Sequence, residues 1–270
     1  MYITCRNSLN DLLHPMVQSL KPVSLSELNR LQLMDRADTK YVMHIADLPG
    51  ILREAAKEYA VLEVQGNRNR RYETIYFDSD DHLLYRMHHN GKAKRYKLRI
   101  RKYFDTGQTF FELKSKNPKS RTVKTRVMWQ KPHEELNDPI EPFRSFCQPE
   151  VDRLHNIHES LKVHFDRITL MHDEKPERIT IDTGLVLTRG NHQKHLLNLC
   201  IVEVKQPRDS SSPFARLMNQ NKIFPMRISK YCLGMILHYQ NLKRNNFKPR
   251  MLRLQKILKK HNPELTPLIP

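Results

Sequence analysis

Three consecutive segments of the chain alternate cationic and apolar residues with the two-residue period of a β-strand, and this pattern most constrains the fold. Residues 95–103 place Lys97, Arg99 and Arg101 on one face and apolar residues on the other. The next two segments repeat the pattern. The cations of these faces are Lys97, Arg99, Arg101, Lys114, Lys116, Lys124 and Arg126. We therefore expect an antiparallel sheet with one cationic and one apolar face.

The cationic face has two interpretations. It can be the solvated side of the sheet, which in half-buried strands usually mixes charges of both signs. Here nearly all the charges are positive, so neighbouring strands would repel each other across the sheet. An anion among the cations removes this repulsion, since Arg and Lys both bind phosphate oxygens well. A polyanion site built on the sheet is the sharper interpretation.

The charge of the whole chain points the same way. The formal net charge is +18 and the pI is near 9.8, which predicts anionic partners such as nucleotide, polyphosphate, nucleic acid or an acidic membrane surface. Nucleic acid is disfavoured, because only 8% of the residues are aromatic and few of these are interleaved with the cations.

The compartment is expected to be the cytoplasm. No apolar run is long enough to span a bilayer, and the first residues lack the layout of a signal peptide. The four cysteines are far apart, which indicates reduced thiols rather than disulfides or a zinc site. Association with a membrane through a partner stays open.

The chain divides into three parts. Residues 1–30 are expected to form a helical segment packed on the outside, and 31–242 a single strand-rich domain. The proline- and acid-rich part of that domain, 131–164, is expected to lie outside the sheet. Residues 243–270 form a basic tail with no acid before Lys260, either a solvated helix or a contact with a polyanion or acidic membrane.

Further charged residues lie on other predicted strands. Arg36, Asp38 and Lys40 share a face near the start of the domain. Glu203 is an isolated acid in an apolar strand, so it is either the partner of a buried lysine or a metal ligand. Ser229 precedes an apolar helix.

The order of these motifs resembles a known family. K-x-R-x-R, F-F-E-x-K, V-K-x-R, a later E-V-K and a terminal S-K-Y follow one another over roughly residues 35–240. This combination resembles the VTC domain, the polyphosphate polymerase module of the vacuolar transporter chaperone complex, in the CYTH-like superfamily of triphosphate tunnel metalloenzymes. Each motif is unspecific, and only their ordered combination carries the resemblance.

The resemblance implies a fold and an activity. The fold would be α+β, an antiparallel β-barrel of about eight strands with flanking helices and a tunnel lined by charged side chains. The activity would be transfer of the γ-phosphate of ATP to polyphosphate, assisted by Mn²⁺ or Mg²⁺.

The resemblance also assigns residues. The catalytic phosphate contacts would be Lys40, Arg99, Arg101, Lys114, Lys124, Arg167, Arg178 and Lys230. Further substrate contacts would be Arg36, Tyr103, Arg126 and Ser229. Glu203 would bind the metal, with Glu112 or Asp182 assisting.

One departure from the superfamily concerns its hydrolytic CYTH branch, which opens with E-x-E-x-K. Arg36, Asp38 and Lys40 occupy those positions here. The missing first carboxylate weakens the case for a two-metal triphosphatase and favours the polymerase. A triphosphatase and a non-catalytic protein that binds polyphosphate or nucleotide stay open as alternatives.

Overall fold

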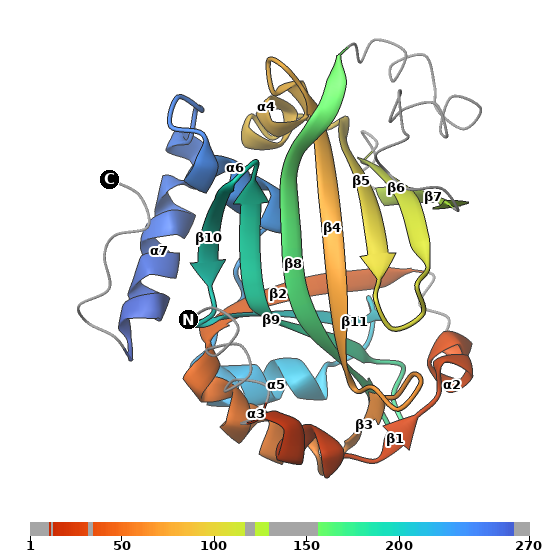
Figure 1. The fold of residues 1–270 in the computed structure, drawn as a ribbon. Helices are drawn as coiled ribbons and strands as arrows, with labels where there is room; N and C mark the ends of the chain where they lie inside the picture. The colour runs from red at the N-terminus through yellow and green to blue at the C-terminus, as the bar shows by residue number, and fades with distance from the viewer. Residues whose placement is uncertain (1–10, 12, 32–34, 117–121, 130–155, 262–270) are drawn as a thin grey trace.

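The computed structural model describes residues 11, 13–31, 35–116, 122–129 and 156–261, and its centre is one curled sheet of eleven strands (Figure 1). The main path runs β2-β11-β9-β8-β4-β5-β6-β7, with β1, β3 and β10 attached at its sides. The strands are β1 (Pro22–Val23), β2 (Arg36–His44), β3 (Tyr59–Leu62), β4 (Asn69–Ser79), β5 (Arg95–Tyr103), β6 (Thr109–Lys116), β7 (Thr122–Trp129), β8 (Ile157–His172), β9 (Arg178–Arg189), β10 (His192–Leu196) and β11 (Leu199–Pro207).

Helices flank this sheet. They are α2 (Leu25–Arg30), α3 (Leu48–Ala55), α4 (Leu83–His89), α5 (Pro213–Gln220), α6 (Lys230–His238) and α7 (Lys248–Lys259), with short 3-10 turns η1 (Ile45–Asp47) and η4 (Asn245–Phe247). Serine side chains cap three of the helices: Ser24 at α2, Ser212 at α5 and Ser229 at α6 each accept a hydrogen bond from a backbone N–H of the first turn.

The predicted fold class is confirmed: an antiparallel barrel-like sheet of eight main strands with flanking helices. All pairs of the main path are antiparallel. β2 and β7 end the path and are not paired with each other in the described residues, so the sheet is curled rather than strictly closed.

Three apolar clusters lie outside the curled sheet or between it and the helices. Under α4, the outward residues of β5 and β6 pack together, among them Leu98, Ile100 and Phe111. A second cluster joins α3 and α5 to β2, β9 and β11, and a third joins α6 and α7 to β8, β9 and β11. Because the apolar residues of each strand face these clusters, the alternate, charged residues of β5 and β6 face the inside of the curl.

The start of β8 corrects one expectation. Residues 131–164 were expected outside the sheet, but β8 begins at Ile157 and pairs with β4 from Ser79 inward. The sequence does not reveal this part of the strand, because His158 and Glu159 are polar. Both side chains are exposed, although both residues pair with β4. Residues 130–155 lie outside the described part of the chain.

The basic segment after residue 243 contains a helix that packs on the fold. In α7, Met251, Leu254 and Leu258 are buried in the cluster shared with α6, while the cations occupy the other side of the helix. A spacing of three and four residues between buried positions is that of an amphipathic helix. The expectation of a solvated helix is therefore wrong for the face of α7 that carries Met251, Leu254 and Leu258. The domain boundaries at 30 and 242 stay a prediction.

Candidate active site

The strand register aligns the charged residues of β5, β6 and β7 in rows across the inner face. Lys97, Lys114 and Lys124 are directly opposite one another across the three strands. The adjacent row contains Arg99, Glu112 and Arg126. The alternation predicted from the sequence therefore brings these cations together, because cross-strand partners lie within about 5 Å of each other at Cβ.

Glu112 is fully enclosed by cations of this face. Its Oε2 accepts a hydrogen bond from Arg99 Nε at 2.7 Å, and its Oε1 contacts Lys124 Nζ and lies 4.0 Å from Arg126 Nε. The carboxyl is 0% exposed. Burial would raise the pKa of Glu112, but Arg99, Arg101 and Lys124 outweigh this effect and hold it well below its usual range.

A second carboxylate holds β8, β9 and α6 together. Asp182 of β9 accepts two hydrogen bonds from Arg167 of β8, from Nε at 2.5 Å and from Nη2 at 2.8 Å, and it also contacts Lys230 Nζ at the start of α6. This bidentate pair fixes the plane of the guanidinium. The pKa of Asp182 is held low by Arg167 and Lys230 against the effect of burial.

The third carboxylate, Glu203 of β11, lies more openly. Its Oε1 is 3.6 Å from Lys40 Nζ and its Oε2 is 3.1 Å from Lys205 Nζ, and its side chain is 19% exposed. Burial alone would raise the pKa of Glu203, but the nearby lysines hold it well below its usual range. Glu203 is therefore a carboxylate anion with one close lysine partner, Lys205, and one more distant partner, Lys40.

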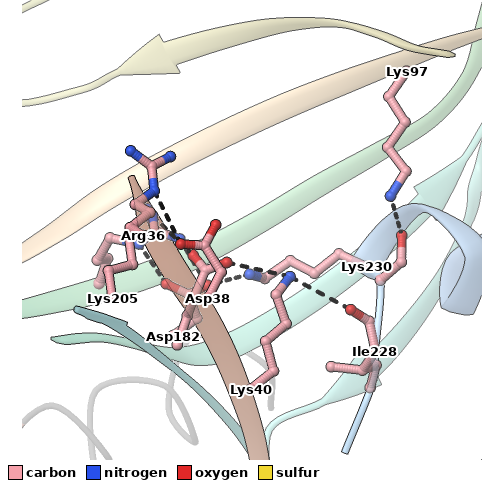
Figure 2. A network of polar contacts seen from close by, with 11 residues as sticks. Arg36, Asp38, Lys40, Lys97, Asp182, Lys205, Ile228 and Lys230 are labelled. Atoms are coloured by element: carbon pink, nitrogen blue, oxygen red, sulfur yellow. Dashed lines mark hydrogen bonds and ion pairs between the residues drawn. The ribbon is translucent and has the colours of Figure 1, made fainter. Parts of the chain in front are cut away.

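Helix α6 closes one end of this charged space. Lys230, its first residue, reaches Asp182, while Lys97 Nζ of β5 donates to the Oγ of Ser229 at 3.0 Å. Figure 2 shows Lys40, Lys97 and Lys230 entering the network from β2, β5 and α6. Tyr231 anchors the same helix by donating its hydroxyl to the buried carboxylate of Asp78.

Some cations of the inner face have no carboxylate partner in the described residues: Lys97, Arg101, Lys114 and Arg178. Burial, together with Arg99, lowers the pKa of Lys114 to about 6. Burial also lowers the pKa of Lys97 to about 8, with Lys40 and Arg99 adding to the effect. Such shifts mean that the charged ammonium group is disfavoured at these positions, because burial and neighbouring cations are not balanced by a close carboxylate.

Two buried polar atoms next to Glu203 also lack a partner in the described part of the chain. They are Nε of Arg178 and Oγ1 of Thr180, both on β9. Thr180 is the register partner of Glu203, and Arg178 that of Lys205, so both atoms border the carboxylate. Buried donors without partners are uncommon in native proteins, and they mark places where a ligand or water completes the hydrogen bonding.

The remaining predicted residues lie at the margins of this space. Arg36 pairs with Asp38 at 3.0 Å, and both side chains are 41% exposed. Arg126 lies 3.3 Å from the ring centroid of Phe110. Tyr103 packs edge-on against Tyr72, with ring centroids 5.0 Å apart. These contacts place Arg36, Tyr103 and Arg126 nearer the rim than Arg99, whose residue is only 9% exposed.

Several residues of the site were not assigned from the sequence. Lys205 pairs with Glu203, and Asp78 anchors α6 through Tyr231. Lys205 is two residues from Glu203 and so shares its strand face. This spacing could have assigned Lys205 to the site from the sequence. The partnership of Asp78 with Tyr231 joins residues 153 positions apart, and only the tertiary structure reveals it.

The three carboxylates Glu112, Asp182 and Glu203 differ in how well each could bind a metal ion. The described residues contain no group of three or more His, Cys, Asp or Glu side chains that could hold one. Glu112 and Asp182 form ion pairs with close cations and are no more than 4% exposed, although Oε1 of Glu112 accepts no hydrogen bond in the described residues. Glu203, partly exposed and beside unpartnered polar atoms, fits the pattern of Mg²⁺ sites, in which one or two carboxylates act together with substrate phosphates and water.

Comparison with known proteins gives one family match. Residues 35–239 match the family model of the VTC domain. No curated protein matches the sequence. Within the described residues, no helix combines the length and the apolar character needed to cross a bilayer.

Several solved structures are similar in chain course. A Bacillus halodurans protein has 12% identity and a TM-score of 0.48, with 76% of this chain and 100% of that chain covered. A Hippeastrum protein, described by a dominant triphosphatase activity, has 13% identity and a TM-score of 0.47, with 75% and 96% covered. An RNA triphosphatase from Schizosaccharomyces pombe has 10% identity and a TM-score of 0.29, with 96% and 94% covered.

Proposed function

Because the chain belongs to the VTC domain family, whose model matches residues 35–239, we propose that it is a polyphosphate polymerase using ATP. One observation carries the proposal. Buried and half-buried cations converge on the inside of the curled sheet, and Lys97, Arg101, Lys114 and Arg178 have no carboxylate partner in the described residues. A chain of phosphates supplies the missing negative charge.

The cations are held ready for a triphosphate. Glu112 orients Arg99, and Asp182 orients both Arg167 and Lys230. Donors fixed before the substrate arrives stabilise developing charge without reorganisation, which is the main contribution of protein to phosphoryl transfer. In this proposal Lys40, Arg101, Lys114, Lys124 and Arg178 complete the set of phosphate contacts.

The transfer needs no general base. An oxygen of the terminal phosphate of polyphosphate, already ionised, attacks the γ-phosphorus of ATP, and the bond from that phosphorus to the β-γ bridging oxygen breaks. ADP leaves with that oxygen, and the polymer grows by one phosphate. The charged residues on the inside of the curled sheet, which we call the tunnel, align the two chains and neutralise their charges.

Glu203 would bind the divalent ion, Mn²⁺ or Mg²⁺. The ion, when bound, would neutralise charge on the triphosphate. Lys40 and Lys205, which now pair with Glu203, would then be free to contact phosphate oxygens. Glu112, enclosed by Arg99 and Lys124, would keep its role of orienting them.

The activity test uses purified protein with ATP and Mn²⁺. The proposal predicts an acid-labile phosphate polymer that a chelator prevents from forming. Release of free phosphate alone would identify a triphosphatase instead. Binding of ATP or tripolyphosphate without any product would identify a binding protein.

A first prediction concerns Glu203→Gln. The substitution removes the charge that would hold the metal and leaves Lys40 and Lys205 unpaired. Polymer formation is expected to fall by about 100-fold or more, the scale at which one electrostatic contact in a transition state acts, while metal-free ATP binding does not weaken.

The matched control for this variant is Glu54→Gln, since Glu54 pairs with Lys57 on the surface of α3 with 50% of its side chain exposed. It should leave both rate and binding unchanged. Full activity of Glu203→Gln would remove the metal role from Glu203.

A further inference from the structure

A cavity of about 400 Å³ lies between α4, α6 and the C-terminal η4 and α7. Apolar side chains form much of its lining, including Met226, Leu233, Phe247 and Met251. The volume of this cavity lies in the range of about 300–1,000 Å³ that is typical of small-molecule sites, although its exposed lining is more polar than apolar.

The polar lining of this cavity is cationic. Arg95, Lys116, Arg227 and Arg250 line it, and no Asp or Glu does so among the described residues. The guanidinium of Arg250 lies 5.3 Å from the ring centroid of Phe247. Guanidinium planes and aromatic rings are the groups on which nucleobases stack. The cavity therefore suits an anionic molecule with a flat apolar part better than a bare phosphate chain.

The cavity continues the cationic rows of the tunnel. Arg95 and Lys116 are register partners, two residues along their strands from the pair Lys97 and Lys114. Two residues span about 7 Å of strand, roughly the length of one or two phosphate groups. Ser229 joins the two regions, because it lines the cavity and its Oγ accepts a hydrogen bond from Lys97.

Part of this cavity belongs to the segment that follows the family match. The match ends at residue 239, while Phe247, Arg250, Met251 and Leu254 come from η4 and α7. The C-terminal helix thus builds one wall of a cavity whose other walls come from the tunnel domain. Arg250 is the cation that α7 contributes to this wall.

We infer that this cavity holds the base and ribose of the nucleoside triphosphate whose phosphates enter the tunnel, an inference that rests on the proposed function. Arg95 and Lys116 contact the first phosphate at the junction, and the remaining phosphates run toward Lys97 and Lys114. The nucleoside half stacks at Arg250 against the apolar floor. The cavity, and with it α7, thereby favours ATP over inorganic tripolyphosphate.

The test compares ATP with inorganic tripolyphosphate by titration calorimetry in EDTA, where turnover stops. Arg250→Glu reverses charge at the stacking position, and Ile228→Trp fills the cavity. Each is expected to weaken ATP binding about tenfold and tripolyphosphate binding less than about twofold. Lys256→Glu is the matched control, since this exposed residue lies on α7 but does not line the cavity; it should change the two ligands equally.

Equal affinity of the unaltered protein for the two ligands, or an equal loss for both in Arg250→Glu, overturns the inference. If Ile228→Trp does not fold, the unaltered protein and Arg250→Glu still decide it. Failure of the proposed function looks different: no polymer forms, while the preference for ATP and its loss in Arg250→Glu are unaffected.

Discussion

Glu112 shows how a single residue organises the tunnel. Its carboxyl is 0% exposed and contacts Arg99 of β5 and Lys124 of β7, so it joins both neighbours of its own strand. Asp182 does the same for Arg167 and Lys230. Glu112 and Asp182 thus hold cations in place, while Glu203 is the most exposed of these three carboxylates, as a metal ligand needs.

The role of Glu112 predicts the behaviour of Glu112→Gln. Removing this charge leaves Arg99 buried without its partner, so the free energy of unfolding is expected to fall by about 3–5 kcal/mol. Tripolyphosphate binding should not weaken, because the net positive charge of the tunnel rises. Chemical denaturation and calorimetry measure the two quantities.

Glu54→Gln, on the surface, serves as the control and is expected to cost less than about 1 kcal/mol. A Glu112→Gln protein of unchanged stability would show that Glu112 does not hold the cations. Loss of metal binding in this variant, with stability unchanged, would instead make Glu112 the metal ligand.

Lys114 predicts a pH dependence of binding. Its pKa is lowered to about 6 by burial and by Arg99, so it is mostly neutral at neutral pH in the free protein. A bound triphosphate raises this pKa, so binding takes up a proton, and affinity falls as pH rises above about 6 until the pKa of the bound state is passed. Calorimetry at about pH 7.5 in two buffers of different ionisation enthalpy measures the uptake.

The Lys114→Arg variant separates the protons taken up by Lys114 from those taken up by the ligand itself. Arginine is charged throughout this pH range, so this variant should take up fewer protons than the unaltered protein. Lys57→Arg, at an exposed position, is the control and should take up the same number. Equal uptake by all three proteins would show that Lys114 already carries its charge before binding.

At the scale of elements, α6 is the part on which the site depends most. It presents Ser229 and Lys230 to the tunnel, and it packs closely against β8. A Cβ added at Gly234 would lie 2.2 Å from Cδ2 of Leu161, a fully buried side chain of β8. Glycine is therefore required here for the close approach of helix and strand.

This close packing predicts the effect of Gly234→Ala. Either the Leu161 side chain leaves its packed position or the helix moves away from β8, at a cost of about 1–3 kcal/mol in the free energy of unfolding. A shift of the helix would take Lys230 away from Asp182, and tripolyphosphate affinity would then fall as well. Thermal unfolding and calorimetry measure the two effects.

Gly50→Ala is the matched control, because no atom lies within 4 Å of a Cβ built at this glycine in α3. It should not destabilise the protein. If Gly234→Ala kept both stability and affinity, the position of α6 would not matter for the site.

The elements that could be predicted from the sequence are those whose two faces differ in chemistry. β5 and β6 alternate cations with apolar residues, so their inner faces could be assigned before the structure was known. The first residues of β8 could not, because His158 and Glu159 are polar and exposed although their backbone pairs with β4. The packing of α7 was not predicted, because the many cations of this segment favour a solvated helix. Its apolar face consists of only a few residues, among them Met251, Leu254 and Leu258.

The arrangement of the candidate site was only partly predictable for a similar reason. Residues on one strand could be grouped by alternation, which placed Arg99 and Arg101 together and Glu203 on a charged face. The contact of Asp182 with Lys230 spans 48 residues and joins a strand to a helix. Such a contact follows from the docking of α6, which no local pattern of the sequence encodes.

At the scale of the whole molecule, a net charge of +18 and a tunnel of unpaired cations predict stabilisation by polyanions. Tripolyphosphate at 100 times its dissociation constant stabilises the folded state by about 2.7 kcal/mol, which corresponds to a rise of roughly 5 °C or more in Tm. Sodium chloride at the same ionic strength should produce a smaller rise, since it screens charges without occupying the tunnel. Equal shifts would mean that tripolyphosphate acts only as a salt.

The proposed binding of phosphates by the cations inside the curled sheet is tested most directly by titrating tripolyphosphate into Arg101→Ala and Arg71→Ala. Arg101 is 8% exposed on the inner face of β5, whereas Arg71 is exposed on β4 between two residues that face inward. We expect Arg101→Ala to weaken binding about tenfold or more and Arg71→Ala to change it less than about twofold. Equal losses in the two variants would contradict the account, since binding would then follow total charge rather than the tunnel.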